Sequence, residues 1–177
     1  SSGDEHTGLF FGEAMVISQT TMFKKMKLDT HENLGWGKIF LPQLEMYTMA
    51  CWITIPQSIS DKFEKEEFND ALLGITYLLG NITPVYLMSS SSDINIVYHV
   101  RSPFTNRPTI YIYDNYQGGI GFSEKIYHSF RELLCMAYEH IKTCGCDKGC
   151  PSCVGPLWWH IGKENKEKLT QNYGDDS

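Results

Sequence analysis

The sequence predicts an α+β fold in which antiparallel strands and two main helices lead into a compact cluster of cysteines. Three observations support this fold class. The first 56 residues are rich in extended segments, two later segments carry apolar residues at helical spacing, and four of the six cysteines lie within one stretch of ten residues. The cluster directly follows the second helix, so we expect that helix to position it.

The composition is that of a globular protein. The chain has 177 residues, of which 42% are hydrophobic and 20% charged, and its formal net charge is −6. This length suits one domain, or one domain with a small appendage. No apolar run approaches the roughly 20 residues of a membrane span and no signal peptide opens the chain, so we expect no membrane contact and a cytoplasmic location. The acidic balance argues against a strongly basic nucleic-acid binder that acts alone.

The N-terminal part indicates β structure because β-branched and apolar residues dominate it. Extended segments are expected at 14–17, 21–28, 38–41 and 44–55, with a break at the glycine-containing stretch 33–37. In the last of these segments, alternate residues form the better candidate for an inward face: Tyr47, Met49, Cys51, Ile53 and Ile55.

The first helix is expected to begin after Ser60, a good capping residue, and to end near Pro84. The apolar residues at helical spacing that should form its buried face are Phe68, Leu72, Ile75 and Leu79. Two short strands at 94–100 and 109–113 should follow it.

The second helix is expected to follow a glycine-rich loop at 114–121, with Ser123 as its cap. Asp114, at the start of this loop, is expected to cap the turn rather than to act as a catalytic acid. One apolar face of the helix is predicted to consist of Ile126, Phe130, Leu133, Leu134, Ala137 and Ile141.

The cysteine cluster has the spacing C-x-C-x3-C-x2-C and consists of Cys144, Cys146, Cys150 and Cys153. Four thiolates satisfy a tetrahedral Zn²⁺ completely and leave no open position, so the spacing predicts one structural zinc ion. An iron–sulfur cluster and a disulfide framework remain as alternatives. His140 is interpreted as a partner of the helix dipole rather than as a ligand. Cys51 and Cys135 lie in apolar patterns and are expected to be buried thiols.

The order of these motifs resembles a known family. The strand 108–114, the loop 116–121, the helix and the knuckle that ends at Pro156 are similar to the MrfA zinc-binding domain of superfamily 2 DEAD/DEAH-type helicases related to mitomycin repair factor A (YprA). The resemblance is specific from about Phe68 to Pro156, and the stretch 30–37 also looks like the segment that precedes this domain. It implies that the four clustered cysteines are zinc ligands and that the parent protein is an ATP-dependent 3′-to-5′ DNA helicase acting in DNA repair.

This resemblance suggests how the chain is divided. We expect a disordered or cloning-derived start at 1–7, a β-rich N-terminal part at 8–58, the zinc-binding domain at 59–156 and a polar segment at 157–177. The chain has no Walker A sequence and no DEAD or DEAH box, so the fragment is not expected to be an enzyme, and no catalytic residues are assigned.

Two groups of residues are candidates for an accessory DNA contact. Backbone N–H groups of Gly118, Gly119 and Gly121 precede a helix start and can hold a phosphate there, although a tightly packed turn is the favoured interpretation. The lysines near the knuckle form the second group, with a solvated surface as its alternative: Lys142, Lys148 and Lys163. Trp158 and Trp159 are expected to cover the zinc or the core rather than to stack on bases.

The expected partners are the ATPase lobes of the parent helicase and DNA. The alternative is a module for protein interaction or intramolecular docking without direct DNA binding, for which the acidic charge is no obstacle.

Overall fold

The computed structural model describes residues 7–20, 22–26, 33–39, 41–146 and 149–155. Its main sheet has four antiparallel strands in the order β1-β4-β6-β5, with the bounds β1 Gly8–Ser18, β4 Leu44–Thr54, β5 Ile94–His99 and β6 Thr109–Asp114. The α+β fold class with antiparallel strands is therefore confirmed. Strand β4 joins the two halves of the sequence because it pairs with β1 along its length and with β6 from Ala50 to Thr54.

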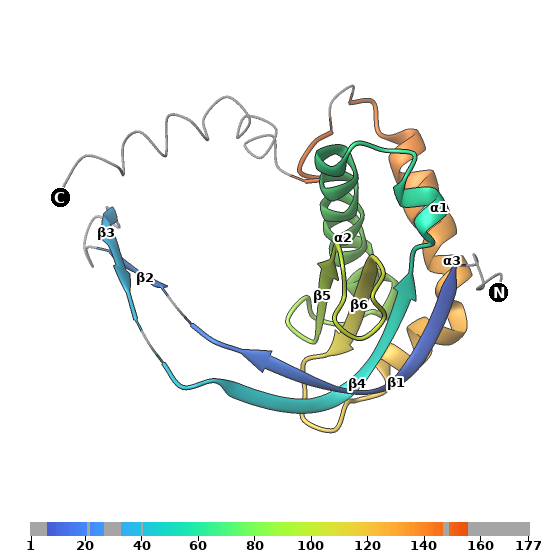
Figure 1. Cartoon of the computed structure of the whole chain (residues 1–177). Coiled ribbons are helices and arrows are strands. Elements are labelled where there is room, and N and C mark those ends of the chain that lie inside the picture. Colours follow the sequence, from blue (N-terminus) through green and yellow to red (C-terminus); the bar gives the residue numbers. More distant parts are fainter. Residues whose placement is uncertain (1–6, 21, 27–32, 40, 147–148, 156–177) are drawn as a thin grey trace.

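A two-stranded ribbon projects from this sheet. It consists of the parts of β1 and β4 that β6 does not reach, and it continues into a second antiparallel pair, β2 (Met22–Met26) and β3 (Asn33–Lys38). The ribbon extends beyond the helical part of the molecule in a long arc (Figure 1). The expected break at 33–37 is wrong, because pairing with β2 holds this stretch as a strand. The two glycines of this stretch indicate a break when it is taken alone, because the pairing with β2 is not evident from the local residues.

Three helices are present in the described part of the chain: α1 (Gln57–Ser60), α2 (Lys65–Leu87) and α3 (Phe122–Thr143). Ser60 does not cap α2. It is the last residue of α1 and its hydroxyl donates to the Gln57 carbonyl, while Glu64 occupies the N-cap of α2. Pro84 does not end α2 either, because it lies in the last turn. Proline has no N–H to donate to the carbonyl of Gly80, but Gly80 is exposed, so water can satisfy that carbonyl. The helix ends at Leu87 and its C-cap is Met88, whose φ of 55° is left-handed.

The buried faces of the two long helices differ in part from the predicted ones. On α2, Phe68, Leu72 and Leu79 are buried as expected, but Ile75 is 38% exposed and Leu78 takes its place in the core. On α3, Ile126, Phe130, Leu133 and Ala137 are buried, whereas Leu134 and Ile141 are exposed. Leu134 and Ile141 have the helical spacing of the buried residues but lie at the edge of that face, so they stay exposed.

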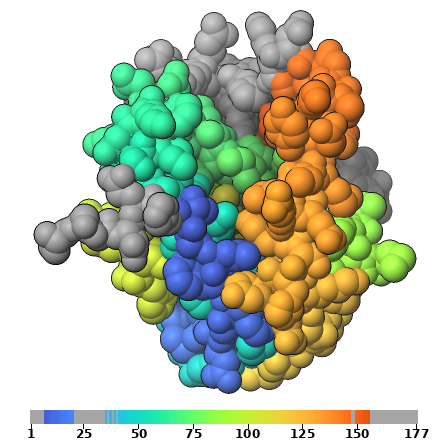
Figure 2. Space-filling model, turned by 90° about the vertical axis from the view of Figure 1, so that its right-hand side faces the viewer, coloured from blue at the N-terminus to red at the C-terminus, as the bar shows by residue number. Residues whose placement is uncertain are grey.

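The core lies between the sheet and α2 and α3, which cover the same face of the sheet and contact each other (Figure 1). Helix α3 also runs beside β1 on the surface seen in Figure 2. The expected inward face of β4 is correct in part, because Cys51, Ile53 and Ile55 join the core but Tyr47 is 57% exposed on the ribbon. No helix of the described part is both long and apolar enough to cross a membrane.

Candidate metal centre

The cysteine cluster begins where α3 ends. The N–H of Cys144 donates to the carbonyl of His140, 3.1 Å away, and the backbone of Cys144 then leaves the helix with φ −71° and ψ 116°. Gly149, with a φ of 85°, reverses the chain ahead of the second pair of cysteines. The N–H groups of Cys153 and Gly155 both donate to the carbonyl of Cys150, at 3.1 and 3.2 Å, and close a tight knuckle.

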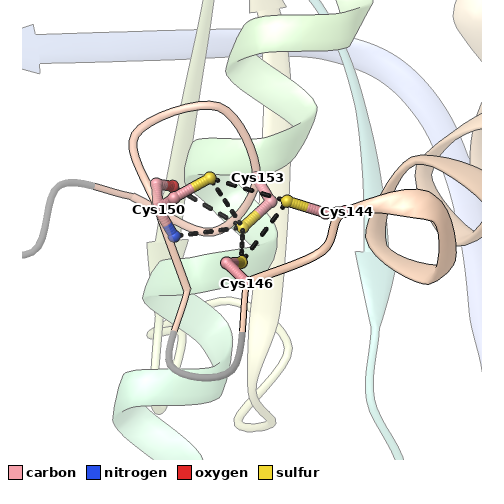
Figure 3. A group of neighbouring side chains, drawn as sticks. All are labelled: Cys144, Cys146, Cys150 and Cys153. Carbon is pink, nitrogen blue, oxygen red and sulfur yellow. Dashed lines mark hydrogen bonds between the residues drawn. The ribbon is translucent and has the colours of Figure 1, made fainter.

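The four sulfur atoms of the cluster point toward one another (Figure 3). The Sγ atom of Cys144 lies 3.3 Å from that of Cys146 and 3.6 Å from that of Cys150. The Sγ atom of Cys153 lies 3.4 Å from that of Cys146 and 3.6 Å from that of Cys150. All four fall within 4.8 Å of one another. Tetrahedral zinc with Zn–S bonds of 2.3 Å separates its sulfurs by about 3.8 Å, whereas a disulfide needs about 2.05 Å. The donor set therefore fits a closed four-thiolate zinc site better than paired disulfides.

The knuckle is attached to both long helices. Val154 packs so closely on α2 that a Cβ built at Gly74 would lie 3.3 Å from the Val154 side chain, and Asn81 Nδ2 donates to the Pro151 carbonyl at 3.4 Å. On α3, His140 Nε2 lies 2.8 Å from the Ser152 carbonyl. These contacts hold Cys153 at 3% exposure, so the cluster is anchored on its second half.

The thiols of the cluster do not ionise alike. Burial opposes ionisation of Cys153, but backbone N–H groups of Cys150 and Val154 and the neighbouring thiols lower the pKa of Cys153 from 9.0 to about 7. Hydrogen bonds with the Cys144 and Cys153 thiols raise the pKa of Cys146 to about 12. Because a metal takes all of its ligands as thiolates, binding must release protons and the affinity must rise with pH.

The glycine-rich loop at the other end of α3 is occupied by the protein itself. The buried carboxylate of Asp114 accepts hydrogen bonds from the backbone N–H groups of Ile120, Gly121, Phe122 and Ser123, at 2.6, 2.9, 3.3 and 2.7 Å, and one from the Ser123 hydroxyl. Asp114 thus caps the turn, as expected, and Gly121 rather than Ser123 occupies the N-cap position. Ser123 lies inside the helix.

The N–H groups of the other two glycines are also engaged. Gly118 donates to the Tyr47 carbonyl at 2.8 Å and Gly119 to the Tyr116 carbonyl at 3.0 Å. Gly119 is further enclosed, since a Cβ there would lie 2.7 Å from Met49. A phosphate would have to displace these internal acceptors, so the geometry favours the packed turn over a phosphate contact through these N–H groups.

The candidate DNA contacts that lie within the described residues do not come together. Lys142 is exposed in the last turn of α3, where its Nζ lies 5.8 Å from the centre of the Tyr138 ring. The glycine loop lies at the opposite end of the same helix, about 30 Å away. Lys148, Lys163, Trp158 and Trp159 lie outside the described residues.

Sequence reasoning missed two features of this region. Cys135 is exposed rather than buried, because it lies beside the buried face of α3 and not on it. The contact of His140 with the knuckle was also missed, although a histidine four residues before the first cysteine is close enough in sequence to suggest it. Cys51 is buried as expected.

Residues 75–154 match the family model of the MrfA Zn-binding domain, a range that includes all four clustered cysteines. The chain is 40% identical over 149 residues to the ATP-dependent helicase YprA of Bacillus subtilis (strain 168), covering 84% of this chain and 20% of the relative. It is 36% identical over 76 residues to the protein MJ1572.1 of Methanocaldococcus jannaschii, covering 41% of this chain and 68% of the relative.

The fold also matches a solved structure. The crystal structure of the DUF1998 helicase MrfA bound to DNA superposes on 98% of this chain and 23% of that chain, with a TM-score of 0.72 and 36% identity. The chain thus spans about a fifth of the length of the helicases it matches.

Proposed function

Because this chain belongs to the MrfA zinc-binding domain family, we propose that it is an accessory, non-catalytic domain of a longer ATP-dependent DNA helicase with a role in DNA repair. The similarity to YprA and to MrfA supports a helicase as the parent protein. The ATPase lobes and the 3′-to-5′ translocation would then belong to the rest of the parent chain.

The observation that carries this proposal is the convergence of four thiols from one ten-residue stretch. Cys144, Cys146, Cys150 and Cys153 would hold one Zn²⁺ and fill its coordination shell, so the ion would be structural and would leave no position for a substrate. The ion would fix the first pair of cysteines to the second pair. The residues of the knuckle then keep the end of α3 docked on α2 through Val154, Asn81 and His140.

The accessory role has two forms, and each has its own support. A DNA contact near the knuckle would use Lys142, together with Lys148 and Lys163, and is supported by the MrfA structure that contains DNA. Docking on the ATPase lobes is supported by the ribbon, which exposes between 47% and 71% of four large apolar or aromatic residues: Met15, Ile17, Leu44 and Tyr47.

Metal analysis of protein purified without added metal tests the zinc assignment. We expect one equivalent of zinc, and Co²⁺ in its place should give the visible spectrum of a tetrahedral tetrathiolate site. An equivalent of iron, or a metal-free protein that folds with a protected knuckle, would contradict it.

The two accessory roles are separated in the parent helicase. If the domain grips DNA, Lys142→Glu should weaken DNA binding and steepen its loss with salt, while Lys62→Glu, in the turn that precedes α2, should not. If the domain only docks, both variants should bind DNA like the wild type, and Tyr47→Asp on the ribbon should release the domain from the ATPase lobes.

A further inference from the structure

The face of the main sheet that α2 and α3 leave uncovered carries a row of aromatic residues. Phe10, Trp52 and Tyr111 are direct neighbours on β1, β4 and β6, and the register places Val97 of β5 next to Tyr111. The rings of Phe10 and Trp52 are nearly parallel, with their centroids 5.9 Å apart, and the centroids of the Trp52 and Tyr111 rings are 6.1 Å apart. The row therefore crosses all four strands of the sheet at one level.

These side chains are presented to the outside rather than packed in the core. Phe10 is 46% exposed and Val97 is 38% exposed, while Trp52 and Tyr111 are half-buried because they lie against one another. Residues on the same strands that point the other way, such as Cys51 and Ile112, are fully buried under the helices. A row of rings on an uncovered sheet is a surface with a specific geometry, unlike scattered exposed apolar residues.

This face is also free of carboxylates, although the chain has a net charge of −6. Alternation along the paired strands places these described residues on it: Gly8, Phe10, Gly12, Ala50, Trp52, Thr54, Asn95, Val97, His99, Thr109, Tyr111 and Tyr113. Asp114 and Glu13 belong to the opposite face. The only titratable cationic group in that set is His99, whose ring meets Tyr111 edge-on at 5.9 Å.

A loop between β5 and β6 brings cations and another ring to the border of the face. The Tyr111 hydroxyl lies 2.7 Å from the Ser102 hydroxyl, which in turn accepts from the N–H of Phe104 at 3.2 Å. Phe104 is 88% exposed. Arg101 is exposed and Arg107 is half-buried, and both belong to the same loop, so the border of the aromatic row is positively charged.

We propose that this aromatic face binds single-stranded nucleic acid, with bases stacked on Phe10, Trp52, Tyr111 and Phe104 and the backbone phosphates drawn to Arg101 and Arg107. Exposed rings beside cations, on a sheet without carboxylates, match the chemistry of a stacking platform for single strands. This inference rests on the proposed DNA-related function but assigns it to a different surface from the lysines near the knuckle. Every base offers a π face, so the binding should depend little on sequence.

The test is the binding of a fluorescein-labelled oligothymidylate to the zinc-loaded chain at low salt, followed by fluorescence anisotropy. Phe10→Ala should lower the affinity on the order of tenfold, the loss typical of one stacked base. Phe63→Ala is the matched control, since Phe63 is 49% exposed and its ring also stacks on another, that of Phe68 at 6.3 Å. Phe104→Ala repeats the test at a position so exposed that folding is not at risk.

Each outcome decides the question. A loss of affinity in both Phe10→Ala and Phe104→Ala, with Phe63→Ala unchanged, supports the stacking face. A duplex of the same length as the oligothymidylate should also bind more weakly than the single strand. If both variants bind like Phe63→Ala while Lys142→Glu loses affinity, the stacking face is wrong and the proposed function survives. If the variants leave DNA binding intact but free the domain from the ATPase lobes, the face is an interdomain interface and the proposal is overturned. No binding to any strand, with DNA binding of the parent unchanged on deletion of the domain, would contradict the proposed DNA contact as well.

Discussion

The two ends of α3 are held by opposite kinds of chemistry. At the N-terminal end, the backbone supplies donors and one buried acceptor, Asp114, satisfies the N–H groups of four consecutive residues. At the C-terminal end, the chain gathers four sulfur acceptors within 4.8 Å of one another. The first end balances its charges within the protein, because the helix dipole is positive there. The second end balances its thiolates only through a cation.

The two ends of α3 should therefore contribute to stability in different ways. A capping carboxylate must be in place in every folded molecule, so its removal should affect global stability. The knuckle is attached at the edge of the core through Val154, Asn81 and His140, so its metal should govern local order. The predictions below test this division between a global and a local anchor.

The largest effect is expected from loss of the metal. Structural zinc contributes roughly 10–16 kcal/mol of apparent binding free energy in zinc-finger peptides, all of which chelation removes. Amide hydrogen exchange should then accelerate from the last turn of α3 through 149–155, while the amides of Ile120 to Ser123 stay protected. Cys153→Ser should behave like the chelated protein, whereas exposed Cys135→Ser should behave like the wild type. Equal acceleration at both ends of α3 would show that the ends are not independent.

Asp114→Ala should produce the next largest effect. It leaves four backbone donors without an acceptor at a site where Asp114 is fully buried, so the free energy of unfolding should fall by about 3–5 kcal/mol. Urea unfolding of the zinc-loaded protein measures this. Asp93→Ala is the control: Asp93 accepts from Ser90 N–H and the Tyr116 hydroxyl, both at 2.8 Å, but it is partly exposed, and about 1 kcal/mol is expected. Similar losses in the two variants would contradict the special role of the buried cap.

The local signals in the sequence predicted much of this arrangement. Cysteine spacing identified the cluster, alternation indicated part of the inward face of β4, and a strand followed by glycines identified Asp114 as a turn cap. These features depend on residues within about ten positions of one another. The wrong assignments depended on which groups actually pair, which residue types alone do not show: β2 keeps 33–37 extended, and Asp114 rather than Ser123 satisfies the start of α3. The open aromatic face was not predicted, because its row exists only in the register of four strands.

A smaller effect is expected at the contact between α3 and the knuckle. His140→Ala removes the hydrogen bond to the Ser152 carbonyl, worth about 1 kcal/mol, and should speed the transfer of zinc to a competing chelator without changing the metal content. His140→Gln, which keeps a donor, should restore part of the slow transfer. A loss of zinc affinity as large as that of Cys153→Ser would instead make His140 a ligand.

The last effect appears only at high pH and compares thiols near the two ends of α3. Burial and the nearby Asp114 carboxylate raise the pKa of Cys51 from 9.0 to about 12, whereas the pKa of Cys153 is lowered to about 7. Between pH 9 and 12 the unfolded chain ionises Cys51 and the native state does not, so the native state holds more protons. The free energy of unfolding should therefore fall as pH rises, by at most about 1.4 kcal/mol per pH unit from this group, with no contribution below pH 9.

Cys51→Ala should flatten the loss of stability above pH 9, and Cys135→Ala should leave it unchanged, because Cys135 is exposed and ionises alike in both states. Urea unfolding from pH 8 to pH 10.5 gives the slopes, and the tyrosines contribute equally to all three proteins. An unchanged slope in Cys51→Ala would mean that the thiol beside Asp114 ionises in the native protein. The start of α3 would then hold a second buried negative charge beside the Asp114 carboxylate, contrary to the raised pKa expected from burial and from that carboxylate.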